Sequence, residues 1–207
     1  MIHATRIAFS VGIISMSIAT LIGVLLGSLS GFFGDTRLRM SRIRFIVFVS
    51  VPRLFLIISI VAIIRNPSLA VVMIIIGLTS WMGIARLIRG ELLRVRSLEY
   101  IEAATALGFS DNRALLKHAI PNALSPVLIA IAFGIAGAIL TEAFLSFIGI
   151  GVPAETVTWG SLLNVARSYT GLWWLAVFPG FAIFLTITFF NLIGEGLTDA
   201  LDPKLKK

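Results

Sequence analysis

The chain has 207 residues, of which 58% are hydrophobic and 13% are charged, and its mean hydropathy is +1.02. Soluble domains carry about 25% charged residues, so this sequence lacks the polar cover that water requires, and lipid is the expected solvent for much of its surface. The net charge of +7 lies in clusters between apolar runs, which indicates membrane topology rather than nucleic-acid binding. Without cysteine, disulfides and thiolate metal sites are excluded, and the separated His3 and His118 predict no metal site.

Five apolar segments are long enough to cross the hydrocarbon as helices, which takes about 20 residues. In chain order they cover about residues 7–33, 45–64, 69–88, 123–148 and 172–193. Small residues inside these segments allow helix backbones to approach closely in lipid. The predicted fold is therefore an all-α integral membrane bundle, with one transmembrane domain over residues 1–207.

Lysine and arginine residues predict the orientation of the bundle. Thirteen of the 17 lie in one set of connections and the C-terminal tail, three lie on the opposite side, and Arg53 lies inside a predicted span. The positive-inside rule places the richer side in the cytoplasm. The C-terminus is then cytoplasmic, and five crossings leave Met1 and the 149–171 connection outside.

The longest cytoplasmic connection, about residues 89–121, is predicted to form two short helices. Gly108 can end the first helix, and the second runs into Pro121. Small side chains at Ala103 and Ala104 would let a groove on a partner protein close around the first helix. An ordinary amphipathic loop helix is the alternative, and the residues alone do not choose between the two.

Several motifs resemble those of permease subunits of ATP-binding-cassette importers. Glu102-Ala103-Ala104, followed by Gly108 and Pro121, resembles the EAA loop of that family. His118 and Ile120 before Pro121, with Asn122 after it, resemble the peptide/nickel branch. The C-terminal third resembles the second permease subunit of dipeptide and oligopeptide transporters in the stretches 141–151, Trp159-Gly160, Trp173-Trp174, Pro179-Gly180 and 191–203.

This resemblance implies a bundle with six helices in a complete member and a cytoplasmic coupling loop. It implies a partner permease subunit, two ATPase subunits that hold the ATP and magnesium, and an external substrate-binding protein, all at the cell inner or plasma membrane. This chain would hold no cofactor and would form half of a pathway for di- and oligopeptides, with nickel or another small solute as the alternative. The implied ATPase-docking residues are Glu102, Ala103, Ala104, Gly108, His118 and Pro121.

Two other functional classes find little support. An ion-coupled secondary transporter usually shows inverted repeats and acidic residues near the middle of the bilayer, and Glu142 is off-centre in its span. A membrane-embedded hydrolase would need a nucleophile and a base facing each other, and no such set is recognisable. A phosphate-binding loop of the GxxxxGK[ST] type is also absent, so the chain is not expected to be an enzyme.

Charged and polar residues inside spans are candidates for function by default. Glu142, Trp159 and Asn191 are the candidates for the pathway or an interface. For Glu142, pairing with Arg167 or reaching the outer boundary is the favoured alternative. Arg53 is expected to extend toward the inner surface, as long basic side chains near a span's end do.

Two features depart from the family pattern. The family has a further helix and an external stretch before the segment that matches Thr5-Arg6-Ile7, so we expect this chain to be a shortened form or a gene model that starts late. That helix would cover the side of the first span that carries Gly23, Gly27 and Gly31. The family's second span also carries an acidic residue before its proline, whereas here Arg53 follows Pro52.

Overall fold

The computed structural model describes residues 1–32, 51–64, 66–101, 108–110, 113, 115–153, 155–169 and 171–201. Helices are the only regular elements in these ranges, so the predicted all-α class is confirmed. The elements are α1 (Ile2–Phe32), α3 (Arg53–Ile64), α4 (Leu69–Arg96), the π-helix η1 (Leu115–Ala119), α7 (Ile120–Ala123), α8 (Ser125–Phe147), α9 (Trp159–Ser168) and α10 (Trp174–Leu201).

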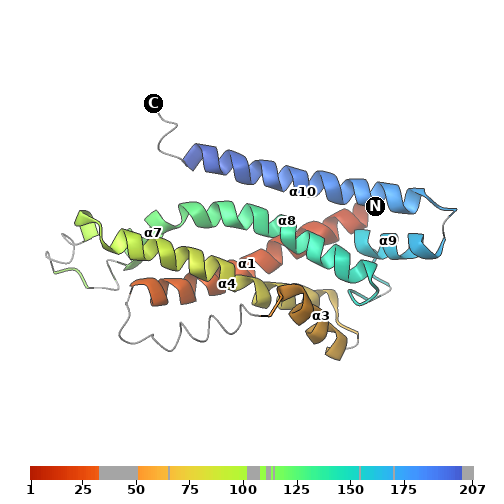
Figure 1. The fold of residues 1–207 in the computed structure, drawn as a ribbon, viewed down its shortest axis with the longest axis horizontal. Coiled ribbons are helices and arrows are strands. Elements are labelled where there is room, and N and C mark those ends of the chain that lie inside the picture. Colours follow the sequence, from red (N-terminus) through yellow and green to blue (C-terminus); the bar gives the residue numbers. More distant parts are fainter. Residues whose placement is uncertain are drawn as a thin grey trace.

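The helices α1, α4, α8 and α10 are each long and apolar enough to cross a membrane. They run lengthwise along the same long axis of the molecule (Figure 1), and they occupy four of the five predicted spans. The second predicted span, 45–64, is described only from residue 51, and its helix α3 has 12 residues. That is about 18 Å of helix, which is too short to cross the hydrocarbon by itself.

The most extensive contact in the described bundle joins α1 to α4, and we call it the glycine interface because Gly23, Gly27 and Gly31 of α1 face α4. A Cβ added to Gly23 would lie 2.8 Å from the carbonyl oxygen of Trp81, and one added to Gly27 would lie 2.6 Å from that of Ala85. Only glycine allows so close an approach of two backbones. The expectation that an additional helix would cover this side is therefore wrong, because α4 already lies against these glycines.

The central helix is α8, which contacts α1, α4, α9 and α10. Its contact with α1 is also close, since a Cβ on Gly134 would collide with the Met16 side chain. Buried apolar side chains of α1, α4 and α8 form the core along this contact. The three helices therefore form one packed unit, to which the remaining elements attach.

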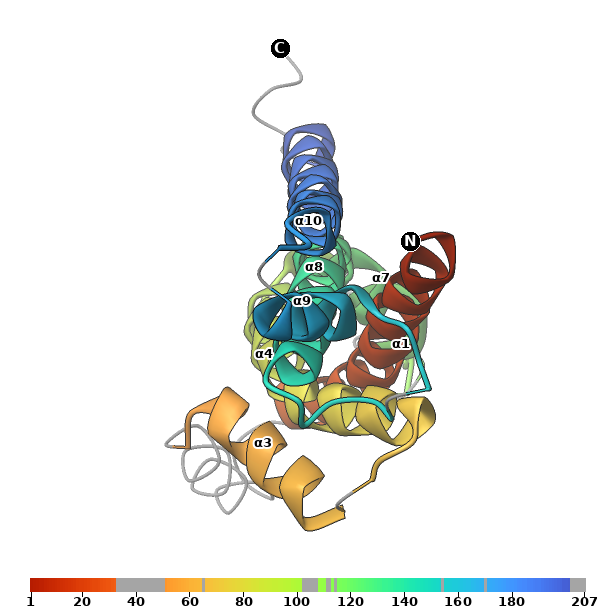
Figure 2. The same cartoon turned by 90° about the vertical axis from the view of Figure 1, so that its right-hand side faces the viewer.

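The last helix, α10, lies on one side of this unit, and α3 lies on the opposite side (Figure 2). Of the 18 consecutive residues that make up the most apolar part of α10, only 6% are buried inside the protein. The contact of α10 with α8 includes Ile183 and Gly194, and Gly194 lies against the ring of Phe133. Large apolar side chains cover the rest of its surface, including Phe178, Phe181, Phe184, Phe189 and Leu192.

Candidate functional site

The predicted docking residues fall in the connection between α4 and α8, whose described elements η1 and α7 lie at one end of the long axis (Figure 1). Glu102, Ala103 and Ala104 lie outside the described residues, as does the side chain of His118. Gly108 is described: it is exposed, it has φ of +84°, and a Cβ placed on it would meet nothing within 4 Å. This positive φ is the conformation that a glycine closing a helix adopts, and other residues adopt it only at a cost.

The second half of the connection forms a continuous path into the membrane. The π-helix η1 passes directly into α7, where Pro121 stands in the first turn, and α7 passes into α8 with Pro126 in its first turn. Proline is tolerated at such positions because the first N–H groups of a helix have no partner within it. The path therefore contains two prolines and leaves the helical assignment at a single residue, Leu124.

The base of this connection packs firmly against the end of α4. Apolar side chains from both sides of the loop are buried in one cluster with the last turns of α4, namely Leu92, Val95, Ile101, Leu115, Ala119 and Ala123. A force applied to the loop would therefore reach α4 and α8 together.

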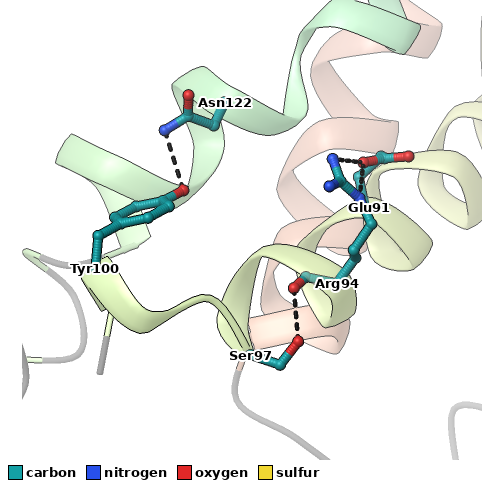
Figure 3. Close-up of polar contacts among 5 residues, drawn as sticks. All are labelled: Glu91, Arg94, Ser97, Tyr100 and Asn122. Carbon is teal, nitrogen blue, oxygen red and sulfur yellow. Dashed lines mark hydrogen bonds and ion pairs between the residues drawn. The ribbon is translucent and has the colours of Figure 1, made fainter. Parts of the chain in front are cut away.

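Polar contacts support the same base (Figure 3). The Asn122 side-chain amide donates to the Tyr100 hydroxyl at 3.2 Å and so joins the two ends of the loop across 22 residues. On α4, Arg94 pairs with Glu91 at 2.9 Å, and the Ser97 hydroxyl donates to the Arg94 carbonyl at 2.8 Å. The Glu91–Arg94 pair is exposed and contributes little stability, whereas the Tyr100–Asn122 bond fixes where the loop closes.

Glu142 and Trp159, two of the candidate pathway or interface residues, meet where α8 packs against α9 at the other end of the bundle. Glu142 is 1% exposed, and its carboxyl accepts a hydrogen bond from Ser146 at 2.7 Å. Arg167 instead lies with its guanidinium carbon 5.5 Å from the centroid of the Phe147 ring. Neither the favoured pairing with Arg167 nor an extension of Glu142 to the outer boundary matches this placement.

The start of α9 closes over this end of α8. Thr158 and Ser161 form a capping box, in which each side chain accepts from the other residue's backbone N–H. Gly160 lies so close to Ala143 that an added Cβ would collide with its carbonyl. Trp159 is 2% exposed, and within the described part of the chain its indole N–H has no partner.

Asn191, the third candidate, does not join the other two. It lies half-buried on α10, 17 residues beyond Trp174, which is about 25 Å along the helix axis. The structure therefore brings Glu142 and Trp159 together at one end and places Asn191 toward the opposite end of the bundle. Nowhere in the described ranges do three histidine or acidic side chains gather closely enough to hold a metal ion.

One charged residue that the sequence assigned to the inner surface lies elsewhere. Arg53 begins α3, and its Nη2 donates to the Thr141 hydroxyl of α8 at 3.1 Å. It also borders a cavity of about 520 Å³ between α3 and the middle of α4. The sequence marked Arg53 as unusual, because it follows Pro52 in a span where the family carries an acidic residue before the proline. The direction of the Arg53 side chain could not be predicted from this difference.

A bundle of four helices that are each long and apolar enough to cross a membrane defines a multi-pass membrane protein. Residues 23–207 match the family model described as "Binding-protein-dependent transport system inner membrane component". The chain belongs to this family.

Curated relatives agree with this family over nearly the whole chain. The oligopeptide permease protein OppC of Bacillus subtilis is 38% identical over 98% of the chain, and the dipeptide permease protein DppC of the same organism is 34% identical over 99%. The glutathione permease protein GsiD of Pectobacterium atrosepticum is 39% identical over 98%. The chain spans 66%, 64% and 67% of the lengths of these three relatives, respectively.

Two solved structures share the fold. A chain of the MetNI methionine ABC transporter in an inward-facing conformation superposes with a TM-score of 0.70 at 19% identity, covering 97% of this chain and 93% of that one. A chain of an amino acid ABC transporter crystallised with histidines gives a TM-score of 0.64 at 17% identity, covering 96% and 90%. At these identities the likeness concerns the fold alone.

Proposed function

We propose that this chain is the permease subunit of an ATP-driven importer and forms half of the translocation pathway for di- and oligopeptides. The observation that carries the proposal is the 34–39% identity, over 98–99% of the chain, to permease proteins named for oligopeptides, dipeptides and glutathione, which is itself a peptide. The other half of the pathway is a homologous permease subunit. An external binding protein delivers the substrate, and two ATPase subunits hold the ATP and magnesium.

The loop between α4 and α8 is the proposed docking site for an ATPase subunit, with Glu102, Ala103, Ala104, Gly108, His118 and Pro121 as the docking residues. The packed base of the loop supports this role, because Ile101 and Leu115 are buried against the end of α4. Closure of the ATPases would move the loop, and the α1–α4–α8 unit would follow as a rigid body. The pathway would then open alternately toward either side of the membrane.

Uptake by the complete transporter, reconstituted in vesicles, tests this function. We expect ATP-dependent accumulation of a labelled tripeptide and none without the ATPase subunits. Gly108→Pro should abolish uptake and substrate-stimulated ATP hydrolysis while the protein stays inserted, because proline cannot adopt φ of +84°. Glu102→Arg should do the same by reversing a charge at the docking surface. Gly108→Asn is the matched control and should retain more activity, since asparagine tolerates positive φ.

Wild-type coupling in both Gly108→Pro and Glu102→Arg would remove the docking proposal. Accumulation of nickel instead of the tripeptide would favour the alternative substrate. One observation weighs against a bare divalent cation: Arg53 and Arg86 both border the α3–α4 cavity, and their charges repel a cation.

The proposed orientation places the loop and the C-terminus in the cytoplasm and α9 outside. Because the chain has no cysteine, single cysteines report on it directly. An impermeant thiol reagent added to intact cells should modify Thr156→Cys, in the connection before α9, and spare Ser110→Cys, in the loop. The reverse pattern would overturn the orientation.

A further inference from the structure

The cavity between α3 and α4 is lined on one side by the start of α3 and on the other by residues 78–83 and Arg86 of α4. These α4 residues lie near the middle of the helix, which runs from Leu69 to Arg96. The cavity therefore lies at membrane depth, and at about 520 Å³ it is large enough to admit part of a small ligand.

Arg53 is held at this cavity by a hydrogen bond to the central helix α8. Its Nη2 donates to Thr141, whose own hydroxyl donates to the Gly137 carbonyl at 2.6 Å. Thr141 stands 16 residues beyond Ser125 in α8, which is about 24 Å along the helix. The hydrogen bond to Thr141 thus holds the guanidinium far from the loop end of the bundle. A side chain that extended toward the inner surface would lie at that loop end.

The charge around the cavity has one sign. Among the described residues that line the cavity, the two charged ones are Arg53 and Arg86, and none is a carboxylate. The first N–H groups of α3, which have no acceptor within the helix itself, add partial positive charge beside Arg53. A basic site of this kind is costly at membrane depth and is a functional hypothesis by default.

We propose that Arg53 binds the C-terminal carboxylate of a peptide as the peptide passes through the permease. The inference rests on the proposed function and deepens it, since the carboxylate is the one anion that every unmodified peptide carries. A guanidinium has five N–H donors in a planar fork that fits a carboxylate with two parallel hydrogen bonds. Within the described part of the chain the Arg53 side chain makes one hydrogen bond, to Thr141, so donors remain for the ligand.

The other polar groups at the cavity suit the rest of a peptide rather than its carboxylate. Thr79 Oγ1 donates to the carbonyls of Ile75 and Ile76 at 2.8 and 3.0 Å, so its proton is engaged and its oxygen remains an acceptor. Ser80 likewise donates to the Ile76 carbonyl. These hydroxyl oxygens can accept hydrogen bonds from the N–H groups of a peptide, whereas Arg53 would bind its carboxylate.

The test compares one tripeptide with a free carboxylate and the same tripeptide amidated at its C-terminus. Maximum uptake rates are measured in vesicles with the complete transporter at saturating loaded binding protein, so that the preference of the binding protein does not enter. Arg53→Gln should lower the rate for the free acid about tenfold, as loss of a hydrogen bond to a charged group does, and the rate for the amide less than twofold. Arg53→Lys, which keeps the charge, should restore part of the free-acid rate.

Two further variants separate binding from folding. Thr141→Val keeps the charge but removes the bond that positions it, so it should give an intermediate, carboxylate-selective loss. Arg167→Gln removes a guanidinium outside the cavity and should change neither rate. Equal losses for acid and amide in Arg53→Gln would overturn the inference while leaving the proposed function standing. Absence of uptake of either peptide by the wild type would overturn both.

Discussion

The glycine interface and α10 use apolar sequence in opposite ways. At the glycine interface, Gly23, Gly27 and Gly31 bring α1 against the backbone of α4. Along α10, large side chains such as Phe181 and Phe184 are more than half exposed. Lipid tails are as apolar as leucine, so hydrophobicity does not drive helices together inside a membrane, and close packing of small residues does. The glycines of α1 therefore mark a closely packed face, and the large exposed side chains of α10 mark a surface that meets lipid or another subunit.

The largest expected effect comes from filling the glycine interface. Gly27→Leu places a Cβ 2.6 Å from the Ala85 carbonyl and in collision with the Ile88 side chain. Because a backbone carbonyl cannot turn aside, we expect destabilisation of about 3 kcal/mol or more, at the upper end of overpacking effects. Gly180→Leu on α10 is the matched control, since its Cβ meets nothing within 4 Å. Unfolding in detergent titrated with a denaturing surfactant measures both variants, and equal stabilities would erase the comparison.

Side-chain truncation sharpens the same contrast at an intermediate level. Ile88 of α4 is fully buried in the core, so Ile88→Ala should cost about 2 kcal/mol through the cavity that it leaves. Phe184 is 60% exposed on α10, and Phe184→Ala should cost much less, because its ring meets lipid whether or not the helix is packed. The same unfolding titration applies. A larger loss for Phe184→Ala would mean that α10 is packed more firmly than its exposure indicates.

The smallest expected effect concerns the buried polar contact between Ser146 and Glu142. Ser146→Ala leaves a carboxyl that is 1% exposed without its 2.7 Å donor, and we expect a loss of about 1 kcal/mol. Ser59→Ala is the control, since Ser59 is exposed on α3 and donates only to the Phe55 carbonyl within its own helix. Matching unfolding midpoints for the two variants would show that Glu142 gains nothing from Ser146.

Hydropathy was sufficient to predict the long helices, because crossing the hydrocarbon requires about 20 apolar residues and such runs are visible in any sequence. It was not sufficient to predict which faces pack. An additional helix was expected to cover the glycines of α1, yet α4 covers them. A one-dimensional pattern shows that a face can pack closely, but it does not show which element packs there. The short α9 was also missed as a helix, although Thr158 and Ser161 stand at the spacing of a capping box.

The candidate site was likewise predictable from the sequence only in part. The family pattern led to the α4–α8 loop, where Gly108 has the positive φ that its position requires, while Glu102 to Ala104 stay a prediction. The surroundings of Glu142 and Arg53 could not be predicted. Both depend on which side of α8 faces α9 or α3, and a rotation of α8 that leaves hydropathy unchanged would give each residue different neighbours.

The length of α4 has a mechanical consequence. Its 28 residues extend about 42 Å, against about 30 Å of hydrocarbon. An α4 that stands along the membrane normal therefore leaves about eight residues outside the hydrocarbon. The basic end from Arg89 to Arg96 is the segment suited to the headgroups and the water beyond them. The loop is then attached to the end of α4 that projects beyond the membrane, rather than to the membrane surface. A small tilt of α4 within the bilayer would displace the loop sideways by a distance that grows with this overhang.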